Sequence, residues 1–334
     1  TLSGGASVRF LGLGGAHSEP YHEGDAGWSR VTPYGVFALQ GRYADFSQSV
    51  QGVRFNGKLS SGSVSWLYPL YSDFQQRLNV QGKFERDHEA IDAPVATAGC
   101  NPLGGLLSLL GLSSCPVTVS SGGEALSEQY NSAELGLSYV GRVQHGERQA
   151  ELQAGLVLRK GLGPHQSAGS GASLDYFLWQ PSFSARYAFT PHWSVLGDGS
   201  FQFANSVLPQ QQMFVIGGPA SLHAYQAGAG IGDHGENLLL GLEWKGYDDS
   251  WVERHGLRPR GFVEYGATSL ARRSVGDPNG TVAIADVGAA ADLRFTSWLA
   301  GSLSLAQPVY RRGEESSPDG LAGKYVFFQL AAKY

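Results

Sequence analysis

The sequence lacks the long apolar runs and the excess of basic residues that would assign it to two common classes of protein. No apolar run approaches the ~18 residues that a membrane-spanning helix requires, and the mean hydropathy is -0.17. The formal net charge is -5, with no basic stripe along the chain. A helical membrane protein is therefore excluded, and nucleic acid is not an expected partner.

Charge and cysteine are also scarce. Charged residues make up 16% of the 334 residues, against about a quarter in an ordinary soluble domain. The two cysteines, Cys100 and Cys115, lie in one segment between expected strands, and they cannot form a zinc site without two further ligands. A close pair in an exported protein favours a disulfide, so we expect Cys100 and Cys115 to be joined and no metal to be bound.

Catalytic motifs are absent as well. The chain has no Gly-x-Ser-x-Gly motif, so a lipase-type nucleophile has no local support. Gly228, Gly230 and Gly232 are spaced unlike a dinucleotide fingerprint, and no helical pattern follows them. The sequence therefore predicts neither an enzyme nor a cofactor.

The sequence is rich in glycine, with 47 residues, and in aromatic side chains, and its polarity alternates along many segments. From Gln149 to Arg159, for example, one face carries Ala150, Leu152, Ala154, Leu156 and Leu158, and the other carries Gln149, Glu151, Gln153 and Arg159. About fourteen segments alternate in this way, and many exceed the ~9 to 11 residues that cross a bilayer at a tilt. Short turns interleave with long connections, as in outer-membrane barrels. A soluble β-sandwich also alternates, but its strands are usually shorter.

These patterns predict an all-β fold, a transmembrane antiparallel β-barrel formed by residues 1–334 as a single domain. The segment 89–128, which contains the cysteines, is expected to be a long external loop. The last strand alternates and carries Phe328 and the aromatic end residue Tyr334. It resembles the strand that bacterial barrel proteins present to the outer-membrane insertion machinery, so that machinery is an expected partner during assembly.

One long connection, at about 207–235, is unusual. It contains most of the stretch FVIGGPASLHAYQAGAGIGDHGEN, which starts at Phe214, is rich in glycine and has almost no helix or strand pattern. Gly217-Gly218-Pro219 indicates a sharp turn, while Leu222 and Tyr225 provide apolar anchors. We expect this loop to fold back into the interior of the barrel. The alternative is a mobile surface loop.

The loop resembles the signature loop of the two-partner secretion transporters, the haemolysin and filamentous-haemagglutinin translocator family, in the superfamily of the outer-membrane insertase barrel. The family pattern has a Gly-Gly turn, then Val-Arg-Gly-Tyr/Phe, then Gly-Asp-x-Gly. The matching residues here are Gly217, Gly218, Leu222, His223, Ala224, Tyr225, Gly232, Asp233 and Gly235. The second family signature, a strand of the form Gly-Phe-x-Asp-x-Gly, appears as Gly261, Phe262, Glu264 and Gly266. The resemblance covers nearly the whole chain.

Two departures from the family pattern affect what the resemblance implies. In the family, the loop arginine contacts the strand aspartate and locks the loop inside the lumen. Here these positions hold His223 and Glu264, a shorter base and a longer acid. Either the pair retains the contact or the loop is held differently. The family also has sixteen strands preceded by two POTRA domains, whereas about fourteen strands and no POTRA domain are visible here. Either further strands lie in segments that the pattern assigns to loops, or the chain is a barrel that begins near the second or third strand of the family.

The resemblance implies a bacterial outer-membrane translocator that exports an unfolded partner exoprotein through a lipid-embedded barrel. The runner-up is a passive diffusion channel for small solutes, and a soluble binding module is third. The paired loop and strand signatures favour translocation, because a porin needs no loop anchored to an acid in the lumen.

Overall fold

The computed structural model describes residues 4–15, 18–50, 53–98, 117–164, 172–218, 221–226, 228–247, 256–271, 280–296, 299–313 and 325–332. Nearly all regular structure in these residues is β-strand, apart from one short 3-10 helix, η1 (Gln210–Gln212). No helix within these ranges has the length and apolarity needed to cross a membrane.

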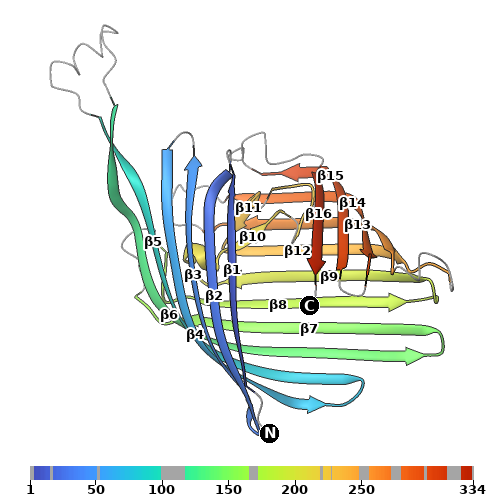
Figure 1. The fold of residues 1–334 in the computed structure, drawn as a ribbon. Helices are drawn as coiled ribbons and strands as arrows, with labels where there is room; N and C mark the ends of the chain where they lie inside the picture. The colour runs from blue at the N-terminus through green and yellow to red at the C-terminus, as the bar shows by residue number, and fades with distance from the viewer. Residues whose placement is uncertain are drawn as a thin grey trace. The chain divides into compact units, whose positions relative to one another are not determined.

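Fourteen strands form one antiparallel sheet in which each strand lies beside the next one along the chain, apart from β10 and β11 (Figure 1). Its strands are β1 (Gly4–Gly15), β2 (Ser18–Thr32), β3 (Gly35–Val50), β4 (Val53–Ser72), β5 (Gln76–Ala98), β6 (Val117–His145), β7 (Arg148–Gly161), β8 (Phe177–Ala188), β9 (Trp193–Ala204), β12 (His234–Trp244), β13 (Arg258–Ser269), β14 (Thr281–Arg294), β15 (Leu299–Arg312) and β16 (Tyr325–Ala332). The predicted all-β antiparallel fold and the count of about fourteen strands are confirmed.

The external loop predicted at 89–128 is too long, because both flanking strands extend into it. Strand β5 continues to Ala98 and β6 begins at Val117. Each additional strand pair satisfies backbone N–H and C=O groups whatever the side chains are, so the ladder continues where the apolar pattern has ended. Cys100 and Cys115 lie outside the described residues, and their disulfide stays a prediction.

Alternate residues of each strand separate onto two faces that differ in polarity. On β13, Val263 is exposed, whereas Phe262 and Glu264 on the opposite face are buried. On β12, Leu240 and Leu242 are exposed in the same way. We call the side with the exposed large hydrophobic residues the apolar face and the other side the polar face. An apolar face of this kind suits contact with lipid.

The chain divides into two compact units. Unit 1 comprises residues 1–66, 83–132 and 166–171, and unit 2 comprises residues 67–82, 133–165 and 172–334. The buried hydrophobic cluster belongs to unit 2, and several of its residues come from the loop at 207–235. The polar face of unit 2 therefore buries apolar side chains where this loop packs against it.

Candidate functional site: the loop on the polar face of unit 2

The loop at 207–235 has more regular structure than its sequence indicates. Strand β10 (Phe214–Ile216) pairs antiparallel with β11 (Gly230–Gly232), although the sequence shows almost no strand pattern there. Two three-residue strands are too short to show a period of two. The resulting small ribbon carries residues 217–229 between its strands. Residues 221–226 are referred to below as the loop tip.

The turn at the base of the tip requires glycine. Gly217 and Gly218 have φ angles of 101° and 84°, a region that side chains disfavour. A Cβ on Gly217 would also lie 2.1 Å from the carbonyl oxygen of Gln226. The turn is closed by a hydrogen bond of 2.7 Å from the Gly218 N–H to the Tyr225 carbonyl. The predicted sharp turn therefore returns the chain so that the tip faces β13 and β14.

His223 and Glu264 are in direct contact at the tip. The backbone N–H of His223 donates to Glu264 Oε2 at 2.9 Å, and His223 Nδ1 lies 2.8 Å from Oε2 and 3.0 Å from Oε1. Glu264 is only 1% exposed, so both loop groups bond to a carboxylate that is shielded from water. Hydrogen bonds to ionised acceptors in such surroundings are the strong ones.

Asp286 is a second buried acid at this site, and the sequence analysis missed it. It lies directly opposite Glu264 in the β13–β14 ladder, and its Oδ2 accepts a hydrogen bond of 2.7 Å from the Ala224 N–H. Two buried carboxyl groups in adjacent positions repel one another unless donors compensate them. The loop tip supplies two donors to Glu264 and one to Asp286 Oδ2, while Asp286 Oδ1 is buried without a hydrogen-bond partner among the described residues. The available signal was an acid at a polar-face position in the alanine-rich strand AIADVGAAAD.

Tyr225 extends the attachment to a third strand. Its hydroxyl donates to the carbonyl oxygen of Tyr310 on β15 at 2.8 Å and lies 3.3 Å from that of Ala285 on β14. Burial, followed by the nearby Asp286 carboxylate, raises the pKa of the Tyr225 hydroxyl, which therefore remains a protonated donor at neutral pH. Three successive loop residues thus bond to β13, β14 and β15.

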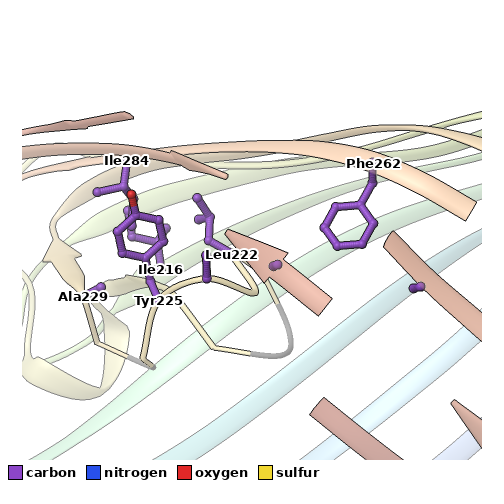
Figure 2. Close-up of a cluster of buried hydrophobic side chains, with 9 residues drawn as sticks. Ile216, Leu222, Tyr225, Ala229, Phe262 and Ile284 are labelled. Carbon is purple, nitrogen blue, oxygen red and sulfur yellow. The ribbon is translucent and has the colours of Figure 1, made fainter. Parts of the chain in front are cut away.

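Apolar contacts complete the attachment of the tip. Leu222 and Ile216 are fully buried, and Figure 2 shows them beside Tyr225 and Ile284, while Phe262 lies apart from them in that view. Gly266 makes room for Leu222, because a Cβ there would come within 2.6 Å of Leu222 Cδ1. This explains the glycine in the strand motif as a site of close packing.

The His223 ring lies near two aromatic side chains as well as Glu264. Its centroid is 5.0 Å from that of Phe262 on β13 and 5.8 Å from that of Phe327 on β16, the latter edge-on. Such separations and tilts are favourable for aromatic pairs. The tip is therefore in contact with the last strand of the sheet through Phe327. The next residue, Phe328, is exposed on the apolar face.

Asp233 fastens the base of the loop. This fully buried carboxylate accepts a hydrogen bond of 2.6 Å from the Leu208 N–H, where the loop begins, and one of 2.7 Å from the Ala271 N–H, just beyond β13. Gln202 on β9 donates to the carbonyl oxygens of Gln212 and Asp233. The Gly-Asp-x-Gly motif therefore holds together the two ends of the loop, a role that spacing alone did not indicate.

The flanking glycines of this motif are tightly packed. A Cβ on Gly232 would lie 2.6 Å from the Ser269 carbonyl oxygen, and one on Gly235 would lie 2.1 Å from the Phe214 ring. Gly261 differs, because it is exposed on the apolar face and nothing lies within 4 Å of a Cβ there. Of the predicted motif glycines, Gly261 thus has no contact with the loop.

Arg159 on β7 provides another contact at the base of the loop. Its guanidinium donates to Gln212 Oε1 at 2.5 Å and forms an ion pair of 2.5 Å with Glu134 on β6. The base and the tip are thus held by separate groups of residues. Within the described part of the chain, no cluster of three metal-ligating side chains is found. Tyr334, like the cysteines, lies beyond that part.

Solved structures similar to this chain include two CdiB proteins, which are two-partner secretion transporters. CdiB from Escherichia coli is 16% identical with a TM-score of 0.65, over 99% of this chain and 55% of CdiB. CdiB from Acinetobacter baumannii is 14% identical with a TM-score of 0.66, over 99% of this chain and 54% of CdiB. The fold is that of the two-partner secretion transporter barrels.

A third similar structure is a BamA protein. BamA from Haemophilus ducreyi lacking POTRA domains 1-3 is 14% identical with a TM-score of 0.57, over 98% of this chain and 70% of that protein. The chain spans about half the length of the two CdiB proteins. No family model matches the sequence, and no curated protein sequence matches it. The antiparallel β-barrel fold expected from the sequence is thus confirmed by structural likeness alone.

Proposed function

We propose that this chain is the barrel of a bacterial outer-membrane translocator, which exports an unfolded partner exoprotein as in two-partner secretion. The observation that carries the proposal is the attachment of the loop tip to two buried carboxylates, Glu264 and Asp286. These acids stand opposite one another on the polar face and receive their donors from the loop. A passive channel needs no arrangement of this kind.

The attachment suits a plug that closes the barrel and can be released. A few hydrogen bonds and buried side chains hold the tip, while Asp233 and Arg159 hold the base separately. Opening of a local segment costs less free energy than global unfolding when its contacts are few. The tip can therefore leave the polar face while the base stays attached, and a passing polypeptide would then meet the polar side chains that line the lumen.

The proposed partners follow from the same reasoning. They are an unfolded exoprotein in the lumen, membrane lipid around the apolar face, and the outer-membrane insertion machinery acting on the last strand. Residues 1–334 are proposed to form one barrel domain, in which loop 207–235 lies in the lumen.

Planar-bilayer recording tests this function. We expect the intact chain to show small, unstable conductance and the Glu264→Ala variant to show larger, steadier conductance. An unstructured, neutral polypeptide added to one side should then produce transient current blockades in the variant. Glu243→Ala is the matched control, because Glu243 pairs with Arg186 on the same polar face and is not bonded to the loop.

The passive diffusion channel is the other outcome of this experiment. In that case proteoliposomes containing the intact chain would swell rapidly in small sugars, and the polypeptide would leave the current of the variant unchanged. Equal conductance of the intact chain and of a variant lacking residues 207–235 would refute the plug.

A further inference from the structure

Unit 1 contains an apolar hollow that takes no part in the loop site. The hollow lies on the apolar face across β2 to β5 and has a volume of about 520 Å³. Its floor is formed by small residues, with Ala26 directly opposite Gly41 and with Gly62 on β4. Its walls are formed by Trp28, Leu39, Val64 and Phe84. A depression with a small-residue floor and large apolar walls fits a flexible hydrocarbon chain.

One rim of the hollow lies where the apolar pattern of β5 ends. Arg86 lines the hollow beside Phe84, and it follows the start of β5 at Gln76 by ten residues. At a rise of about 3.3 Å per residue and a tilt of about 35–45°, Arg86 stands roughly 25 Å above that start. The apolar band of such barrels is also about 25 Å tall. Arg86 therefore lies at the boundary between hydrocarbon and headgroups.

This rim is positively charged. The guanidinium of Arg86 is exposed on the apolar face and donates to the amide oxygen of Gln129, at 2.8 Å from Nη2 and 3.1 Å from Nε, when that amide is turned toward it. Gln129 is neutral, so this contact does not compensate the charge of Arg86. Lys58 is also exposed on this face of β4, while the acid Asp45 lies opposite His22 in the β2–β3 ladder.

The structure assigns the hollow and its rim as a binding site for an anionic membrane lipid. One acyl chain occupies the hollow, and the phosphate of the headgroup bonds to the Arg86 guanidinium, with Lys58 nearby. An arginine offers a planar fork of donors that matches phosphate geometry. The apolar floor and the cationic rim are together complementary to an amphiphilic anion. The assignment does not depend on what the barrel transports.

Charge also distinguishes a lipid from a second copy of this chain. In a two-fold contact through this face, each copy presents the same patch to its partner, so the arginines of the two rims approach one another. Like charges at this boundary repel, and no acid is among the residues that line the hollow. A lipid phosphate brings the required negative charge with the acyl chain.

Electron spin resonance with spin-labelled lipids measures this preference directly. The purified chain is reconstituted in phosphatidylcholine vesicles, and the motionally restricted fraction is compared for spin-labelled phosphatidylglycerol and phosphatidylcholine. We expect the intact chain to prefer phosphatidylglycerol. Because a basic residue at a membrane surface contributes about 1 kcal/mol, Arg86→Gln should lower the preference about fivefold. Gly62→Leu, which fills the floor and keeps the charge, should lower it as well.

Two control variants decide whether the effect belongs to this site. Arg30→Gln removes another exposed arginine of β2 on the same face, and Gly261→Leu fills an exposed glycine position in unit 2 where a Cβ meets open space. Both should leave the preference unchanged, and inorganic phosphate should not displace the lipid. The assignment is overturned if Arg30→Gln has the same effect as Arg86→Gln, if Gly62→Leu has no effect, or if cross-linking shows copies joined through the hollow.

Discussion

Truncation of Glu264 should weaken the attachment of the loop tip, and the geometry allows us to estimate the free energy that is lost. The carboxylate accepts hydrogen bonds from the backbone N–H and the imidazole of His223. Hydrogen bonds to charged groups each contribute about 1.5–3 kcal/mol, so Glu264→Ala removes about 3–6 kcal/mol. Water entering the space recovers part of this loss, and we expect a net effect of about 3 kcal/mol. The open fraction of the tip should then increase by roughly two orders of magnitude.

Glu264→Gln should have a much smaller effect. An amide oxygen placed at the position of Oε2 still accepts both hydrogen bonds, but the bonds lose the strength that the negative charge gives them. Charge-assisted bonds are roughly twice as strong as neutral ones, so about 1.5 kcal/mol is lost and the open fraction should increase about tenfold. The graded order, with Ala far above Gln and Gln above the intact chain, is the specific expectation.

Hydrogen exchange of the Ala224 amide measures the opening in each variant. This N–H bonds to Asp286, which neither substitution changes, so its exchange rate reports release of the tip rather than loss of the mutated contact. Glu243→Ala serves as the control on the same polar face and should leave the rate unchanged. If Glu264→Ala leaves the Ala224 rate unchanged in a folded barrel, or if Gln and Ala give equal rates, the tip is not held by this carboxylate.

Three other predictions concern Asp233, Gly266 and Tyr225. Asp233→Ala leaves two backbone N–H groups without their acceptor and should lower the stability of the barrel by about 2–5 kcal/mol. The unfolding temperature, measured from the mobility shift of the folded barrel in gel electrophoresis, should fall, and an unchanged temperature would contradict the role given to this acid. Gly266→Ala should displace Leu222 and lower the stability of the barrel by about 1–3 kcal/mol in the same assay, whereas Gly261→Ala should leave the stability unchanged. Equal effects of the two substitutions would contradict the close packing of Leu222 against Gly266. Tyr225→Phe removes one hydrogen bond of the hydroxyl and should weaken the attachment of the tip by about 0.5–1.5 kcal/mol. Hydrogen exchange of the Ala224 amide should therefore increase less than in Glu264→Ala, and a larger increase would show that Tyr225 holds the tip more strongly than Glu264 does.

The sequence by itself determined the strands and the polarity of their faces. Side chains in a strand alternate between faces, so a period of two fixes which residues of a strand share a face before any partner strand is known. Alternation from Gln149 to Arg159 therefore predicted strand β7, whereas the placement of Glu264 in the lumen came from the resemblance of its strand to the family motif. The lack of long apolar runs excluded membrane-spanning helices. This property is also local, because the hydropathy of a segment depends only on residues that are neighbours in sequence. The predicted end of β5 and the predicted start of β6 were wrong, because the hydrogen bonds between these strands continue beyond the apolar pattern.

Only the tertiary structure decided how the loop is held. Asp286 lies 62 residues from Ala224 in sequence, and the register of the β13–β14 ladder is what sets it beside Glu264. Its donor is a backbone N–H, which every residue except proline has and which therefore leaves no signature in the sequence. The same holds for Asp233, whose two donors are backbone amides, one where the loop begins and one just beyond β13. The resemblance to the family motifs pointed to a contact between His223 and Glu264, with a loop held differently as the alternative, because both residues are side chains in those motifs. Bonds to the backbone depend on folded positions alone.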